Sequence, residues 1–93
     1  MKFVWLNKQG VASDQGFVLQ SVDRYAFEYR EGNRVATLKG EDFRQNGRYG
    51  FGFYGFPEFW NPPFDKIPIA EKDRIVNNIK EAMAFMNILT KFE

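Results

Sequence analysis

The apolar pattern of this 93-residue chain changes its period once, across a segment that holds all four prolines, residues 57–68. Before this segment, apolar and polar residues alternate or form short runs, which is typical of β-strands. After it, apolar residues recur every three or four positions, as in an amphipathic helix. Proline lacks the N–H that a strand or helix interior requires, so the segment itself is expected to be a loop. The sequence therefore predicts a sheet followed by one helix.

We expect four or five antiparallel strands in the first part of the chain. The most regular alternation lies in residues 24–30, where three aromatic side chains share one face. The next residues, Glu31-Gly32-Asn33, favour a tight turn, and the chain returns as a partner strand. The expected strands are 3–6, 17–22, 24–30, 34–39 and 48–56, and turn composition marks residues 8–16 and 40–47.

The last third of the chain carries one apolar stripe with helical spacing. Its members are Ile75, Val76, Ile79, Ala82, Met83, Met86 and Leu89. Pro68 suits the first turn of a helix, and a helix of about 20 residues would bury this stripe against the sheet. The predicted fold class is α+β: a meander of four or five antiparallel strands with one C-terminal amphipathic helix on one face. We expect a single domain that covers residues 1–93.

The side chains that most often carry out catalysis are missing from the sequence. The chain has no His and no Cys, which removes the usual general base, the thiolate nucleophile and the commonest metal ligands. The hydroxyl groups then have no imidazole to activate them. We therefore expect that the protein is not an enzyme and that it holds no metal or cofactor.

Charge and hydropathy limit the class of partner. The chain has 13 Lys and Arg against 12 Asp and Glu, so its charge gives no field that would by itself attract a polyanion. The apolar run at residues 3–6 is short, because a secretory signal has about 7–15 apolar residues and a membrane span about 20. We expect a cytoplasmic protein that does not contact a membrane.

Residues 50–55, with the sequence GFGFYG, match the dinucleotide-binding motif in full and belong to a stretch that matches an RNA-binding motif in part. The dinucleotide motif G-x-G-x-x-G must open a helix, whereas Phe56-Pro57 follows here. The stretch also matches part of the RNA-recognition motif, in which Phe51 and Phe53 would stack on bases. The pattern favours a core position for both rings, with Gly50 and Gly52 on the opposite face of the strand. Single-stranded RNA binding through the aromatic strand 48–56 is the alternative function.

Aromatic residues make up 18% of the chain, more than one small core is expected to need. Those that lead into the proline segment are expected at the surface, where Trp, Tyr and Arg are typical interface anchors. The residues expected to bind a partner are Arg44, Arg48, Tyr49, Tyr54, Phe56, Glu58, Phe59 and Trp60. The rings would anchor the partner, and the charged residues would select it.

The order of these features resembles a known family. The segment Phe59-Trp60-Asn61-Pro62-Pro63 precedes a helix pattern that begins Ile75-x-x-x-Ile79. Residues 17–89 as a whole resemble the small immunity proteins encoded with bacterial polymorphic toxins, as in contact-dependent growth inhibition systems. The resemblance implies an α+β protein that neutralises one cognate toxin domain, such as a nuclease, by occlusion. It implies no list of contact residues, because these vary with the toxin.

Two further points concern the partner. Immunity proteins against nucleases are often acidic, whereas this chain is nearly neutral, which allows a partner surface that is acidic or of mixed charge. A homodimer is a third interpretation, because an open sheet edge can pair with a second copy.

Overall fold

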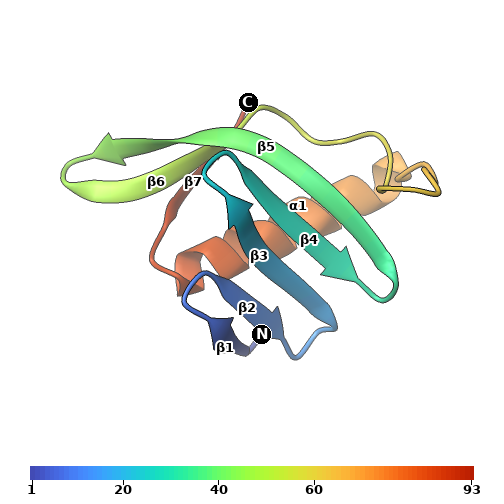
Figure 1. The fold of residues 1–93 in the computed structure, drawn as a ribbon, viewed down its shortest axis with the longest axis horizontal. Coiled ribbons are helices and arrows are strands. Elements are labelled where there is room, and N and C mark those ends of the chain that lie inside the picture. Colours follow the sequence, from blue (N-terminus) through green and yellow to red (C-terminus); the bar gives the residue numbers. More distant parts are fainter.

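The computed structural model describes residues 1–93 and shows an α+β fold with a larger sheet than the sequence predicts. Seven strands form one curled, mixed sheet in the order β1-β2-β3-β4-β5-β6-β7. The strands are β1 (Phe3–Asn7), β2 (Gly10–Ser13), β3 (Phe17–Asp23), β4 (Ala26–Glu31), β5 (Arg34–Gln45), β6 (Arg48–Phe53) and β7 (Leu89–Phe92), and the helix is α1 (Ile69–Phe85). Figure 1 shows the sheet curled as a half-barrel along one side of α1.

The predicted strands and helix are all present, and apart from the far end of β5 and the end of the helix their ends lie within three residues of the predicted ones. The tight turn between β4 and β5 includes Gly32, whose φ is +62°, a value that glycine adopts without strain. α1 is shorter than predicted, at 17 residues, and buries Ile75, Ile79, Ala82 and Met83 of the predicted stripe. The helix is neither long enough nor apolar enough to cross a membrane.

Two segments that the sequence predicts as turns contain strands instead. Residues 10–13 form β2, which pairs with β1 and β3, and β5 continues to Gln45. The turn after β5 is confined to Asn46 and Gly47, which both have positive φ, 52° and 79°, as a two-residue type I′ turn requires. The polar composition of residues 40–45 gives the wrong prediction because side chains on the outer face of a one-sided sheet are solvated.

The sequence pattern does not predict β7. After α1, Asn87 adopts a positive φ of 61°, a common way for a helix to end, and the chain returns beside β6. β7 runs parallel to β6, with Phe51 beside Thr90 and Phe53 beside Phe92. The prediction of a purely antiparallel sheet of four or five strands is therefore wrong in both the number of strands and their direction.

The core lies between the concave face of the sheet and α1. Its largest fully buried side chains are Tyr29, Phe17, Phe51, Phe53, Leu19, Leu38, Ile75, Ile79, Met83 and Val11. The ring of Phe27 meets Phe51 and Phe53 edge-on, at centroid distances of 4.9 and 5.7 Å. Edge-to-face packing of this kind adds to the free energy of area burial.

β5 belongs to both halves of the sheet and changes partner at Gly40. Its first half pairs with β4, and from Gly40 onward it pairs with β6. A Cβ atom on Gly40 would lie 2.1 Å from the main-chain oxygen of Gly52, so only glycine allows the two strands to approach this closely. β5 is bent, and this bend carries the β5–β6 hairpin away from the first half of the sheet (Figure 1).

One hydrogen-bond network joins α1 to the sheet. The buried Tyr29 hydroxyl donates to Glu31 Oε2 at 2.6 Å and accepts from Asn78 Nδ2 at 3.0 Å. Arg74 donates to both carboxylate oxygens of Glu31, at 2.8 and 2.9 Å. Because each of these polar groups has a hydrogen-bond partner, the free-energy cost of removing it from water is offset.

The ionised form of Glu31 is expected to stabilise the fold. The Arg74 guanidinium, helped by the Tyr29 hydroxyl, holds the pKa of Glu31 below its ordinary value. Such a carboxylate contributes stability above the pKa of the unfolded chain, and this contribution is lost as the pH falls through the folded-state pKa. An unfolded Glu has a pKa of about 4.3. We therefore expect the free energy of unfolding to decrease as the pH is lowered past this value, and we expect Glu31→Gln to show a smaller decrease.

Urea denaturation of both proteins at neutral and acidic pH measures this difference. Asp14 also lowers the free energy of unfolding at acidic pH, in wild type and variant alike, because the main-chain N–H of Lys2 lowers the pKa of Asp14. If the free energy of unfolding decreases equally in the two proteins, the ionised Glu31 does not stabilise the fold.

Candidate partner-binding surface

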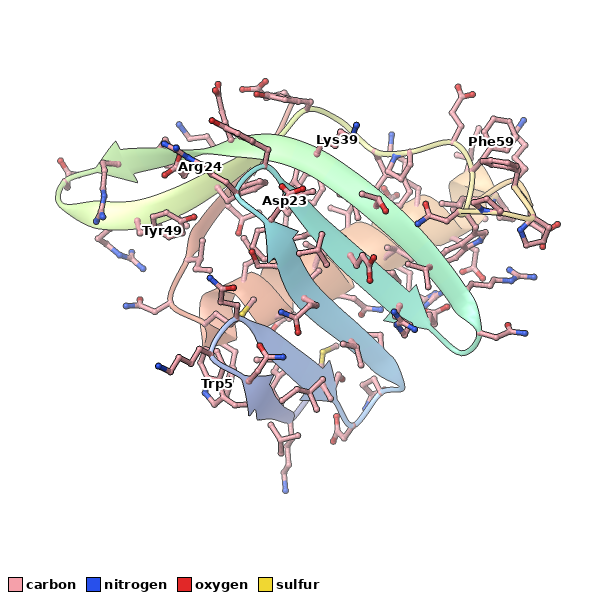
Figure 2. The ribbon with its side chains drawn as sticks, in the orientation of Figure 1. Trp5, Asp23, Arg24, Lys39, Tyr49 and Phe59 are labelled. Carbon is pink, nitrogen blue, oxygen red and sulfur yellow. The ribbon has the colours of Figure 1, made fainter.

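The eight residues predicted to bind a partner divide between two places. Arg44, Arg48 and Tyr49 lie on the β5–β6 hairpin. The other five, from Tyr54 to Trp60, lie in residues 54–68, here called the proline loop. Figure 2 shows Tyr49 and Phe59 near opposite ends of the long axis of the molecule. The eight residues therefore do not form one continuous surface.

On the hairpin, local contacts hold the predicted side chains. The Arg44 guanidinium lies 5.6 Å from the centroid of the Tyr49 ring, and Arg48 Nη2 donates to Asn87 Oδ1 at 3.1 Å. Partial burial, with the charge of Asp42, raises the pKa of the Tyr49 phenol. The Arg44 guanidinium beside the Tyr49 ring helps to hold that ring in place.

Tyr49 also lines two adjoining hollows between the β5–β6 hairpin and the first half of the sheet. Their volumes are about 210 and 390 Å³, and both include Gln9, Ser21 and Phe27 in their walls. Trp5 lines the smaller hollow, and charged groups of both signs, among them Arg24 and Asp42, line the larger. Apart from Tyr49, the residues of these walls are outside the predicted set, because they come from segments far apart in the chain.

The proline loop is fastened to β5. Asn61 donates its main-chain N–H to the carbonyl oxygen of Val35 at 2.7 Å, and its side-chain Nδ2 donates to Thr37 Oγ1 at 2.9 Å. Two hydrogen bonds from one residue fix the middle of the loop against the sheet.

The loop is also closed on itself. Phe59 and Lys66 form an isolated antiparallel bridge, and the N–H of Ile67 donates to the carbonyl oxygen of Glu58 at 2.8 Å. The main-chain N–H of Trp60 donates to Asp65 at 2.9 Å. These bonds, with the fixed φ of the prolines, leave the loop little freedom.

Trp60 lies in the core, with 4% of its surface exposed. Its ring stacks with Tyr29 at a centroid distance of 6.3 Å, and Arg34 lies 5.9 Å from its centroid. The expectation that Trp60 lies at the surface is therefore wrong. Its buried ring instead anchors the proline loop to the core. Its indole N–H has no hydrogen-bond acceptor, so packing of the ring holds it in place.

The tips of the loop expose aromatic rings to solvent. Phe59 is 46% exposed and Phe64 is 64% exposed, and Pro62 and Pro63 between them are exposed as well. Phe64 is absent from the predicted set, although its position between Pro63 and Asp65 is a signal for a surface loop. We call Phe59 and Phe64 the loop aromatics.

The remaining predicted residues, Tyr54, Phe56 and Glu58, line two hollows formed by the proline loop and its neighbours. Tyr54 is exposed and lines a hollow of about 290 Å³ with residues of β5. Phe56 is half-buried, with Lys72 Nζ 6.0 Å from its centroid. Glu58, Lys66 and Lys72 border a second hollow of about 310 Å³. The surroundings of the loop thus carry both signs of charge.

The rings on which the RNA alternative depends are not at the surface. Phe51 is 1% exposed, Phe53 is fully buried, and both face α1. Neither ring can stack on a base without unfolding of the core. Of the aromatic residues in strand 48–56, Tyr49 and Tyr54 are exposed.

Comparison with family models, with curated proteins and with solved structures finds no match for this chain. The structure also shows no cluster of carboxylates able to hold a metal ion. The chemistry of the candidate surface is that of apolar rings, prolines and flanking charges, which suits contact with another macromolecule.

Proposed function

We propose that the protein binds a protein partner and neutralises it by occlusion, as a small immunity protein does with its cognate toxin domain. The resemblance of residues 17–89 supports the class of function, and a cytoplasmic location belongs to the same proposal. The observation that carries it is the proline loop, which presents Phe59 and Phe64 to solvent on a closed and anchored backbone.

A loop of this kind is suited to tight binding. Exposed aromatic rings provide large contact areas and are frequent energetic centres of interfaces. Binding by a loop that is already ordered avoids much of the entropy cost of fixing the chain. The neighbouring charges of Glu58, Lys66 and Lys72 would orient the partner and exclude partners of the wrong charge pattern.

Removal of the loop aromatics is expected to weaken the complex with the toxin. The double variant Phe59→Ala/Phe64→Ala should lose at least about 100-fold in affinity, since truncation of a central interface residue costs about 2 kcal/mol or more. Titration calorimetry with a toxin-like domain encoded beside the gene gives the affinity. Tyr25→Ala is the matched control, because Tyr25 is 53% exposed and lies in the β3–β4 turn.

The same domain provides a test in cells. Co-expression of the protein should restore growth to cells that produce the toxin domain, and the double variant should not. If no toxin-like domain is encoded nearby, or if such a domain does not bind, the proposed function fails. Salt-dependent binding of single-stranded RNA at micromolar protein would favour the alternative instead.

A further inference from the structure

The first strand of the sheet is an open edge with unusually exposed side chains. β1 pairs with β2 on one side and begins the strand order of the sheet. Four of its five residues are exposed, whereas in β7, at the opposite edge, only Lys91 is exposed. In Figure 2, Trp5 lies at the end of the molecule away from Lys39 and apart from Phe59. β1 is thus a surface separate from the proline loop.

The ladder between β1 and β2 shows which main-chain groups of β1 are free. The N–H of Asp14 donates to the carbonyl oxygen of Lys2, and the register places Phe3 opposite Ser13. In an antiparallel pair, hydrogen-bonded positions alternate with non-bonded ones. Because the main chain of Lys2 bonds to β2, the next residue to do so is Val4. The main-chain N–H and C=O groups of Phe3 and Trp5 therefore point outward to the open edge.

Apolar side chains border these outward groups on both faces of the sheet. Val4, Trp5 and Leu6 are 63%, 51% and 54% exposed. The ring of Phe85, at the end of α1, lies 5.6 Å from Trp5 and extends the apolar surface on the concave side. A strand added at this edge would bond to Phe3 and Trp5 and cover the side chains around them.

The charges around β1 indicate what kind of strand fits. Lys2 and Lys8 flank the strand, and the only acidic residue among residues 1–22 is Asp14, which accepts the main-chain N–H of Lys2 from the β2 side. A second copy fits poorly. In the twofold antiparallel arrangement that pairs all of β1 with its copy, Lys2 lies opposite Lys8 of the copy, and like charges placed opposite each other are destabilising.

We propose that β1 is a docking edge for an extended segment of the protein partner, which adds to the sheet beside β1 and carries acidic residues near Lys2 and Lys8. This inference rests on the proposed function only for the identity of that partner. The added strand gains affinity from the main-chain bonds to Phe3 and Trp5 and specificity from the two lysines.

A synthetic probe tests the edge without any toxin. The probe is a backbone-cyclised β-hairpin peptide whose free strand has alternating Val and Thr between two Glu residues, with a Lys-flanked hairpin as its counterpart. Amide hydrogen exchange is followed by NMR. The Glu-flanked hairpin should slow exchange at Phe3 and Trp5 at least about tenfold, and leave Val4, which already bonds to β2, nearly unchanged.

Charge reversal at the flanking lysines tests the specificity. Lys2→Glu/Lys8→Glu should weaken binding of the Glu-flanked hairpin about tenfold or more and favour the Lys-flanked one, since two cross-strand charge pairs change sign. Lys39→Glu/Lys80→Glu, with two exposed lysines outside β1, is the control and should bind like wild type.

Three results would overturn the inference. The first is the absence of protection at Phe3 and Trp5 at millimolar hairpin. The second is equal binding of the two hairpins. The third is a dimer in light scattering whose Phe3 and Trp5 amides are protected without any peptide, which would identify a second copy as the occupant. Failure here leaves toxin binding through the proline loop intact, and failure of toxin binding leaves the hairpin result valid.

Discussion

The substitution Gly40→Ala is expected to destabilise the protein by about 3 kcal/mol, because it inserts a methyl group where β5 and β6 touch. The added Cβ would meet the main-chain oxygen of Gly52 at 2.1 Å and its carbonyl carbon at 2.9 Å. A side chain could rotate away from such a contact, but a main-chain carbonyl within a sheet can move only if the ladder moves with it. Chemical denaturation with a two-state fit gives the free energy of unfolding.

Gly52→Ala is the matched control for this experiment. A Cβ on Gly52 would come no closer than 3.9 Å to any neighbour, so we expect a change within about 1 kcal/mol. The two substitutions add the same atom to facing strands of the same ladder. If both cost the same, the close approach at Gly40 does not explain the bend in β5.

The second large effect is expected for Ile79→Ala. Ile79 is fully buried where α1 packs on the sheet, and truncation of a buried Ile to Ala leaves a cavity and costs about 2–5 kcal/mol. The control on the same helix is Ile69→Ala. Because Ile69 is 84% exposed, its truncation should change the free energy of unfolding by less than about 0.5 kcal/mol. Similar losses at the two positions would show that α1 does not pack as described.

Local periodicity accounts for the elements that the sequence predicts. The spacing of Ile75, Ile79 and Met83 is a strong helical signal, and these residues are buried as expected. The hairpin around Gly32 also follows from its own residues. Both signals depend on neighbours in the chain, which a sequence displays directly.

The elements that the sequence does not predict depend on contacts between distant residues. β7 has only four residues, and it is a strand because β6 lies beside it. The second half of β5 resembles a turn in composition, yet β6 pairs with it as far as Gln45. Non-local pairing of this kind leaves little trace in a short stretch of sequence.

The candidate surface shows the same difference between features set by local sequence and features set by distant contacts. Loop composition correctly places Phe59 at the surface but not Trp60, whose burial depends on a space beside Tyr29. The exposed edge at Trp5 cannot be read from residues 3–6, because an apolar strand at the edge of a sheet and one at its centre have the same pattern.

The parallel pairing of β6 with β7 has a consequence during synthesis on the ribosome. Gly50 to Phe53 of β6 meet their β7 partners at residues 89–92, after α1 in the chain. Until those residues emerge and the helix docks, a nascent chain exposes the aromatic rings of β6 and one unpaired edge, a combination that favours aggregation. Rapid folding of α1 onto the sheet would shorten this vulnerable interval.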